Sequence, residues 1–221
     1  MGNSWGNGKT IRREEARRRA TPFRRRFLVP VWALIAFLIH SVSGCSTTLI
    51  PPKGEVADPR PVFLLDHGRH TSLVVGTAEG SMVRYAYGDW RFYADQDMRL
   101  RTGLAALLWP TPATLARREL TGPADEVTLL SHLRVGVRGV YGLQVPGHAA
   151  DRLRQELDEV HGKEPEKHQY VEVYDFVFAP HPEPYTFLNN SNTKVAQWLR
   201  SMEVEVRGPA LLSIWRLEAT H

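Results

Sequence analysis

Cysteine is almost absent from this chain, because Cys45 is the only one among 221 residues. A single cysteine leaves no partner for an intramolecular disulfide. The histidines offer no metal site either, since His67 and His70 are three positions apart on an expected turn and strand and no third ligand follows at a recognisable spacing. The sequence therefore predicts no disulfide, no metal and no cofactor.

The part of the chain from Cys45 onward also lacks an excess of basic residues. The formal net charge is +4 and the isoelectric point is near 9.4. Residues 1–44, however, hold nine of the 28 lysines and arginines and only two of the 24 acidic residues, so the remainder carries a net charge of −3. A mildly acidic domain without a stripe of lysine and arginine binds a phosphate backbone poorly, which excludes nucleic acid as a partner.

The N-terminal segment has the layout of a bacterial secretory signal. Eight arginines lie within residues 11–26, and an apolar run of 18 residues follows over residues 27–44. The run is interrupted by a proline and a histidine and ends in the small residues Val42-Ser43-Gly44, directly before Cys45. This length is marginal for spanning a hydrocarbon core of about 30 Å and suits a signal peptide.

A cysteine directly after small residues is the acceptor in bacterial lipoprotein processing. We therefore predict that residues 1–45 form a lipoprotein signal peptide with its acylation cysteine, and that Cys45 becomes the lipid-bearing N-terminus. The alternative is an uncleaved anchor with an incidental cysteine. Arg24-Arg25-Arg26 is also similar to a twin-arginine export signal, so the export route stays open. Ser46, by resemblance to lipoproteins in general, favours the periplasmic face of the outer membrane.

The rest of the chain is expected to be one tethered domain. Residues 46–60 contain Pro51, Pro52 and Pro59 and are predicted to be a flexible tether. Residues 61–221 contain no internal repeat, and their number fits a single domain within the usual range of about 100–200 residues.

Hydrophobic patterns predict mixed secondary structure within this domain. Expected strands cover residues 61–65, 71–75, 82–87, 126–133, 140–145, 170–178 and 211–217. Expected helices cover residues 102–108, 113–120 (as a short helix or turn), 147–161 and 192–202. Because the strands and helices do not alternate regularly, we expect an α+β fold around a mostly antiparallel sheet.

Four motifs occur in a fixed order along the domain. They are Asp66-His67-Gly68-Arg69-His70-Thr71-Ser72, Tyr87-Gly88-Asp89-Trp90 with Phe92-Tyr93, Leu107-Leu108-Trp109-Pro110-Thr111-Pro112, and Asn189-Asn190-Ser191-Asn192-Thr193. Together they resemble a family of uncharacterised bacterial conserved hypothetical proteins, some of them lipoproteins. Members of that family carry His-Gly-x-His-Thr, Gly-Asp followed by Phe-Tyr, Trp-Pro-x-Pro and a late Cys-Asn-Thr. The resemblance covers most of residues 61–217.

That family in turn resembles circularly permuted papain-like, or NlpC-like, proteins, in which the histidine strand precedes the cysteine helix. The resemblance implies a single papain-like domain with His70 as general base, Asp89 as the group that orients it, and position 191 as nucleophile. A thiol at a helix N-terminus has a lowered pKa because the helix dipole favours the thiolate, and a neighbouring histidine activates it.

Position 191 departs from the family pattern, because it is a serine. A serine hydroxyl depends wholly on its base, whereas a thiol is partly ionised near neutrality. Whether the protein is an enzyme therefore stays open. One hypothesis is an amide hydrolase or acyltransferase that acts on peptidoglycan or another envelope amide. The alternative is a non-catalytic ligand-binding or scaffold module that retains the papain-like cleft, and a structural accessory factor is a third option.

Structural roles would also explain several of these residues. Ser191 is a suitable N-cap for the helix expected from Asn192. Asn189 and Asn190 are frequent turn formers. The aromatic residues Tyr170, Tyr174, Tyr185 and Phe187 would line a pocket or, as is common for aromatics in such numbers, fill the core.

Overall fold

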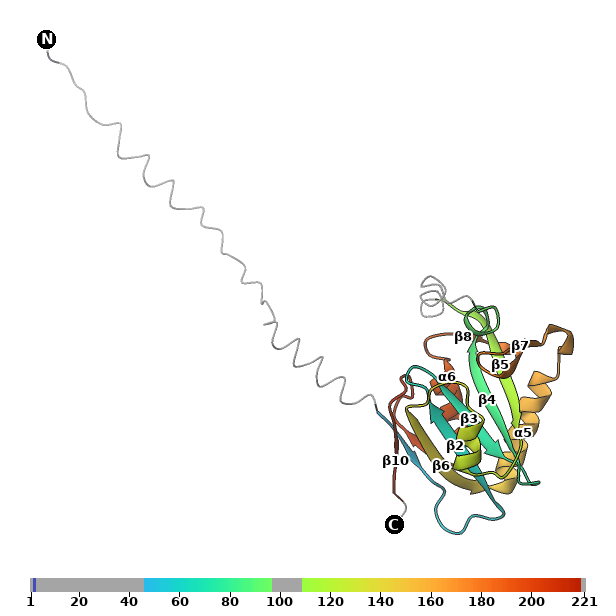
Figure 1. Cartoon of the computed structure of the whole chain (residues 1–221). Helices are drawn as coiled ribbons and strands as arrows, with labels where there is room; N and C mark the ends of the chain where they lie inside the picture. The colour runs from blue at the N-terminus through green and yellow to red at the C-terminus, as the bar shows by residue number, and fades with distance from the viewer. Residues whose placement is uncertain (1, 3–45, 97–108, 220–221) are drawn as a thin grey trace. The chain divides into compact units, whose positions relative to one another are not determined.

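The structure is a computed structural model that describes residue 2 and residues 46–96 and 109–219 (Figure 1). The predicted signal peptide, the acylation site at Cys45 and the expected helix over residues 102–108 lie outside the described residues. The chain divides into two compact units, Met1–His40 and Ser41–His221. The second unit holds all the described strands and helices, and it is an α+β unit with mostly antiparallel sheets.

A seven-stranded sheet forms the centre of this unit, with the order β6-β2-β3-β4-β5-β8-β7 and every neighbouring pair antiparallel. Its strands are β2 (Pro59–Asp66), β3 (Thr71–Gly76), β4 (Met82–Asp89), β5 (Thr111–Leu120), β6 (Gly139–Pro146), β7 (Gln169–Val171) and β8 (Phe176–Tyr185). The expected strands over residues 61–65, 71–75, 82–87 and 140–145 are confirmed as β2, β3, β4 and β6.

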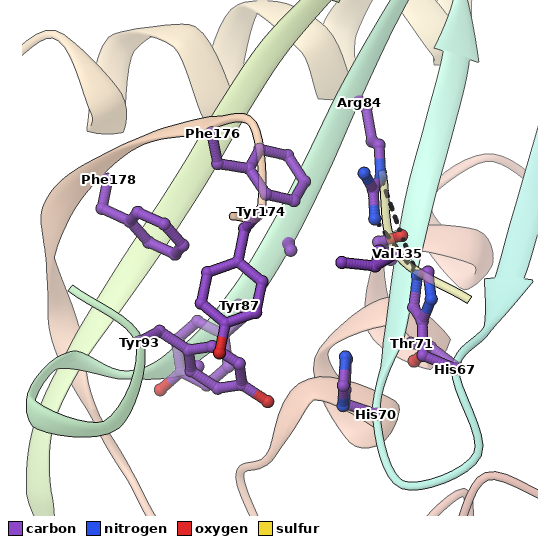
Figure 2. A pocket seen from close by; sticks show the side chains of 13 residues that line it. His67, His70, Thr71, Arg84, Tyr87, Tyr93, Val135, Tyr174, Phe176 and Phe178 are labelled. Atoms are coloured by element: carbon purple, nitrogen blue, oxygen red, sulfur yellow. Dashed lines mark hydrogen bonds between the residues drawn. The ribbon is translucent and has the colours of Figure 1, made fainter. Parts of the chain in front are cut away.

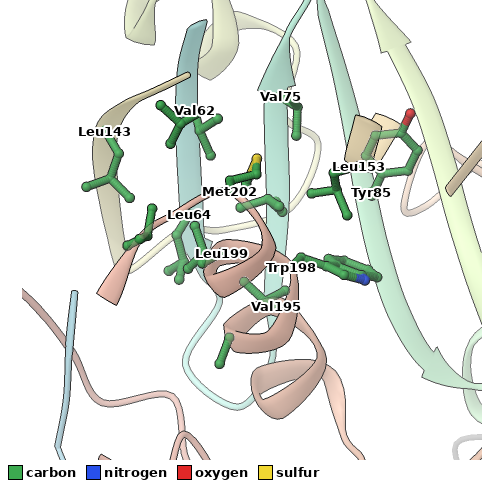
Figure 3. Packing of buried hydrophobic residues seen from close by; sticks show 14 of the residues in the cluster. Val62, Leu64, Val75, Tyr85, Leu143, Leu153, Val195, Trp198, Leu199 and Met202 are labelled. Atoms are coloured by element: carbon green, nitrogen blue, oxygen red, sulfur yellow. The ribbon is translucent and has the colours of Figure 1, made fainter. Parts of the chain in front are cut away.

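Two helices cover one face of the sheet. Helix α5 (Gly147–His161) has the predicted bounds, and α6 (Ser191–Ser201) lies within one residue of the prediction. Figure 3 shows Val195, Leu199 and Met202 packed against the buried side chains of β2 and β3. Because strand side chains alternate between faces, the opposite face carries a separate set that includes Arg84, Phe176 and Phe178.

A smaller three-stranded sheet joins the two ends of the described region. Strand β1 (Thr47–Ile50) pairs in parallel with β10 (Trp215–Leu217) and antiparallel with β9 (Glu205–Arg207). Residues 47–50 were expected to belong to a flexible tether, yet Leu49 is fully buried. The partners of β1 lie more than 150 residues away in the chain, so local sequence did not reveal the pairing. Residues 51–58 have no regular secondary structure.

Two predicted elements have the wrong type. Residues 113–120, expected as a helix or turn, belong to strand β5, because the pairing of β5 with both β4 and β8 overrides the helical propensity of alanine, leucine and arginine. Residues 126–133, expected as a strand, contain helix α4 (Glu126–Ser131). The carboxylate of Asp125 accepts a hydrogen bond from the Thr128 amide and so caps α4.

Two predicted strands are shorter or divided. Residues 170–178 form β7, a turn and the start of β8, and Asp175 in that turn has a φ of 53°. The strand expected over residues 211–217 comprises only β10. Two short helices complete the described elements: α2 (Trp90–Tyr93) and the 3₁₀ helix η2 (Pro165–Lys167).

The packing of α6 gives a testable prediction for stability. Leu199 is fully buried between α6 and the sheet, so Leu199→Ala should lower the free energy of unfolding by about 2–5 kcal/mol. Gln197→Ala, on the exposed side of the same helix, should change it by less than about 0.5 kcal/mol. Urea denaturation of the two variants measures both values. Equal effects would contradict the packing described.

Candidate functional site

The residues singled out from the sequence gather at one end of the large sheet. His70 directly precedes β3, Asp89 ends β4, and Ser191 begins α6. Two hydroxyls connect these elements: the Thr71 hydroxyl donates to the Asn192 side-chain oxygen at 3.1 Å, and the Tyr87 hydroxyl accepts from the Asn189 side-chain nitrogen at 3.0 Å. Tertiary pairing thus brings together three motifs that are far apart in the sequence.

Ser191 is the first residue of α6 and does not cap the helix. Asn190 is the N-cap, because its side-chain oxygen accepts hydrogen bonds from the backbone amides of Asn192 and Thr193, at 2.9 and 3.0 Å. The Thr193 hydroxyl accepts in return from the Asn190 amide at 2.8 Å, which completes a capping box. The capping role considered for Ser191 is therefore wrong. Its side chain is buried, and its hydroxyl makes no hydrogen bond with any described residue.

His70 contacts other aromatic rings. Its ring stacks on His67 with centroids 5.0 Å apart and meets the edge of Tyr93 at 5.7 Å. Burial, together with the positive charge of Arg84, lowers the pKa of His70. The ring is therefore neutral at pH 7, the form that a general base requires. Among the described residues, its nitrogens make no hydrogen bond with Ser191 or Asp89.

Asp89 is already occupied by structural contacts. Its carboxylate accepts from the Phe92 backbone amide at 2.8 Å and so caps α2. The other carboxylate oxygen accepts a hydrogen bond from the Thr111 hydroxyl. Both oxygens are engaged, so Asp89 holds β4, α2 and β5 together. The structure brings His70, Asp89 and Ser191 to the same end of the sheet but does not join their side chains.

A cavity of about 30 Å³ lies at this end (Figure 2). One side of it is polar and consists of His67, His70, Ser72 and Arg84. The other side is aromatic and consists of Tyr93, Tyr174, Phe176 and Phe178. Thr71, Ala86, Tyr87, Gly88 and Val135 complete the lining, and Ser191 is not part of it.

Three residues of the polar side, His67, Ser72 and Arg84, form a hydrogen-bonded cluster. His67 lies with Nδ1 2.9 Å from the Gly136 carbonyl oxygen, and since a carbonyl only accepts, Nδ1 carries the proton. The Nε2 atom is then an acceptor, 3.0 Å from the Ser72 hydroxyl and 3.2 Å from Nη2 of Arg84. Burial lowers the pKa of His67 to about 4, so this ring is also neutral at pH 7.

Arg84 is the buried charge of the cluster. Its side chain donates from Nε to the Ser72 hydroxyl at 3.2 Å, and its guanidinium carbon lies 4.4 Å from the centre of the Phe176 ring. The residue is only 4% exposed. Burial lowers the pKa of Arg84 to about 10, which leaves the side chain cationic at neutral pH.

Arg84 and Ser72 are site residues that were not predicted from the sequence. A signal for Arg84 was present, because it is the only charged residue within the apolar strand predicted over residues 82–87. Ser72 lies at the end of the first motif, and its hydrogen bond to His67 depends on the turn that folds residue 67 back onto β3. The His67 amide donates to the His70 carbonyl at 3.0 Å in that turn.

The size of the cavity limits its chemistry. A hydrogen-bonded serine and histidine can supply a nucleophile and its base. Small-molecule sites, however, usually have volumes of about 300–1,000 Å³, whereas this cavity holds only a functional group of a few atoms. Within the part of the chain that the structure describes, no three His, Cys, Asp or Glu side chains group as metal ligands.

Comparison with protein-family models, with curated proteins and with solved structures found no match for this chain. Over the described residues, no helix has the length and apolar character needed to cross a bilayer.

The buried neutral state of His67 predicts acid sensitivity. Its folded-state pKa, about 4, lies below the value of about 6.5 expected for the unfolded chain, so stability is complete above pH 6.5 and falls as the pH drops towards 4. The loss attributable to His67 is on the order of 3 kcal/mol. His67→Gln should flatten this part of the profile, as measured by urea denaturation between pH 7 and pH 4.

The exposed His148 provides the matched control. His148→Gln should keep the acid dependence of the parent protein, and a parallel profile for His67→Gln would show that His67 is not buried in neutral form.

Proposed function

We propose that this chain is a bacterial cell-envelope lipoprotein whose domain is a non-catalytic, papain-like ligand-binding module. The main support for a non-catalytic role is that His70 lines the cavity and Ser191 does not. A general base must come within about 2.6–3.2 Å of the proton that it removes. His70 instead contacts His67 and Tyr93, and Asp89 is occupied by α2 and Thr111.

The order and packing of the elements support the papain-like part of the proposal. His70 and strand β3, which begins at the next residue, precede helix α6 in the chain, and α6 packs on β3 and β4 of an antiparallel sheet. This is the arrangement that the resemblance to permuted NlpC-like proteins implies. Replacement of the family's cysteine by Ser191 removes the nucleophile, and the cleft is retained as a binding site.

A serine-dependent amide hydrolase or acyltransferase is the second candidate. It is favoured by the position of Ser191 in the first turn of α6, where the helix dipole stabilises negative charge, and by its lack of a hydrogen-bond partner among the described residues. Peptidoglycan peptides or another envelope amide would be the substrate, with Ser191 attacking and His70 as base.

A serine-directed fluorophosphonate distinguishes the two candidates. We expect the full-length protein to show no more labelling than its Ser191→Ala variant, because no base activates the Ser191 hydroxyl. Quantitative labelling, with mass spectrometry of the peptide that contains residue 191, measures the difference. Labelling of the parent protein that Ser191→Ala and His70→Ala both abolish would establish the hydrolase instead.

The position of β1 bears on the proposed lipid anchor. Strand β1 begins at Thr47, so one residue separates it from Cys45. The Thr47 amide donates to the Ile214 carbonyl at 2.8 Å, and the side chains of Leu212 and Ile214 nearby are exposed. A diacylglycerol on Cys45 would therefore hold the domain directly against the lipid surface, on the periplasmic face of the outer membrane, where peptidoglycan is within reach.

Cys45→Ala tests the anchor. The variant should retain its leader and should incorporate no radioactive palmitate, because the acylation site is gone. Ser46→Ala leaves Cys45 in place and should be processed and labelled like the parent protein. Cleavage and membrane association of Cys45→Ala at the level of the parent would contradict the lipoprotein proposal.

A further inference from the structure

Arg84 is a buried cation that forms no ion pair with a described carboxylate. Its guanidinium carries five N–H donors, and two of its nitrogens make hydrogen bonds, Nε with Ser72 and Nη2 with His67. Both partners are neutral. No carboxylate oxygen of a described residue lies within 4.0 Å of the guanidinium. A charge buried in this way is costly to the folded protein unless an anion accompanies it.

The neighbouring Arg118 shows the contrast. It lies opposite Arg84 in the β4–β5 pair, yet its Nε atom is 3.2 Å from a carboxylate oxygen of Asp175, and its side chain is 42% exposed. The other oxygen of Asp175 accepts from the Tyr170 hydroxyl at 2.8 Å. Asp175 therefore forms its ion pairs with Arg118 and Arg134. Its charge acts on Arg84 only from beyond 4.0 Å, where it partly offsets the lowering of the pKa of Arg84 by burial without contacting the guanidinium.

The surroundings of Arg84 suit the head group of an anion. The Nη1 donors and one Nη2 donor are not used by described residues and belong to a side chain that lines the cavity. His67 and His70 line the cavity, are partly exposed and are neutral at pH 7. His70 can donate a further hydrogen bond, since its nitrogens have no partner among the described residues.

We propose that this cavity binds the carboxylate of a ligand, with the guanidinium of Arg84 as its anchor and His70 as a second donor. The inference rests on the proposed binding function and names the ligand class for it. A planar guanidinium matches a carboxylate with two parallel N–H···O bonds. The body of the ligand remains outside, because a volume of about 30 Å³ accommodates little more than the head group.

A carboxylate fits this site better than a phosphate does. One cation balances the single negative charge of a carboxylate, whereas a phosphate monoester carries between about 1.5 and 2 negative charges at pH 7. The aromatic wall of Tyr93, Tyr174, Phe176 and Phe178 offers no additional cation and favours an apolar group next to the head. A peptide C-terminus and the end of a fatty acid share this chemistry.

Acetate and acetamide test the head group on the full-length protein in detergent micelles. They are nearly identical in shape and differ in charge. Acetate should shift the Nε–H resonance of Arg84 in a saturable manner, and acetamide should bind at least about tenfold more weakly, which is about 1.4 kcal/mol. Equal shifts with both compounds, or no saturable shift with acetate, would overturn the proposal.

Variants of Arg84 and Arg118 test whether Arg84 is the residue that binds the carboxylate. Arg84→Met should weaken acetate binding at least about tenfold, and Arg118→Met, on the same face of the sheet, should leave it within about twofold. If Arg84→Met does not fold, Arg84→Lys replaces it, because lysine keeps the charge and loses the planar fork. Unchanged affinity in the folded Arg84 variant would also overturn the proposal.

Larger probes distinguish the two sources of the carboxylate. N-acetyl-alanyl-alanine and hexanoate are each compared with their amides. Tighter binding of the peptide acid than of acetate assigns the site to a peptide C-terminus, and tighter binding of hexanoate assigns it to a fatty acid. Failure of every acid to bind, with Ser191 unlabelled by fluorophosphonate, removes this inference alone. Labelling of Ser191 would remove the proposed binding function, whatever the result with acetate.

Discussion

The packing of α6 on β3 and β4 is the contact on which the described site depends. Val195 and Leu199 are fully buried against the sheet, and this fixes the helix axis. The Asn190 capping box then determines where the helix begins. The Thr71 hydroxyl joins that beginning to β3 through Asn192. Without this helix, residues 70 and 191 would have no fixed relation to each other.

The two-residue period of the strands divides the chemistry of the domain between two faces. On β4, Tyr85 points into the core beneath the helices, while Arg84 points to the opposite face, towards Phe176. A polar cluster thus forms on the face that α6 does not cover. Its charge is held among aromatic rings, where the low polarity of the surroundings strengthens every hydrogen bond to it. The polar cluster and Ser191, which begins α6, thus lie on different faces of the sheet, and this supports the proposed binding function over catalysis.

The polar cluster also has consequences for stability. His67 is neutral and Arg84 is charged in the folded state, and both side chains share a small buried space. The folded state is therefore most stable when both groups keep these protonation states. Acid disturbs that pattern by protonating His67 next to an existing cation. If an anion binds Arg84 as proposed, it would pair with this buried charge, and its binding would then stabilise the folded state through the same guanidinium.

The sequence by itself determined the elements whose signals are local. The apolar spacing of Leu153 and Leu157 predicted α5 with its correct bounds, and β-branched runs predicted β3. Three of the motifs, which contain His70, Asp89 and Ser191, lie at one end of the sheet. Tertiary structure alone decided the rest. Residues 111–120 form strand β5 because β4 and β8 pair with them, and β1 forms because β9 and β10, which are distant in the sequence, pair with it. Tertiary structure also decided that Arg84, whose local signal was only its place in an apolar strand, is buried beside His67 and Ser72, since these three residues meet only when a turn and two strands pack together.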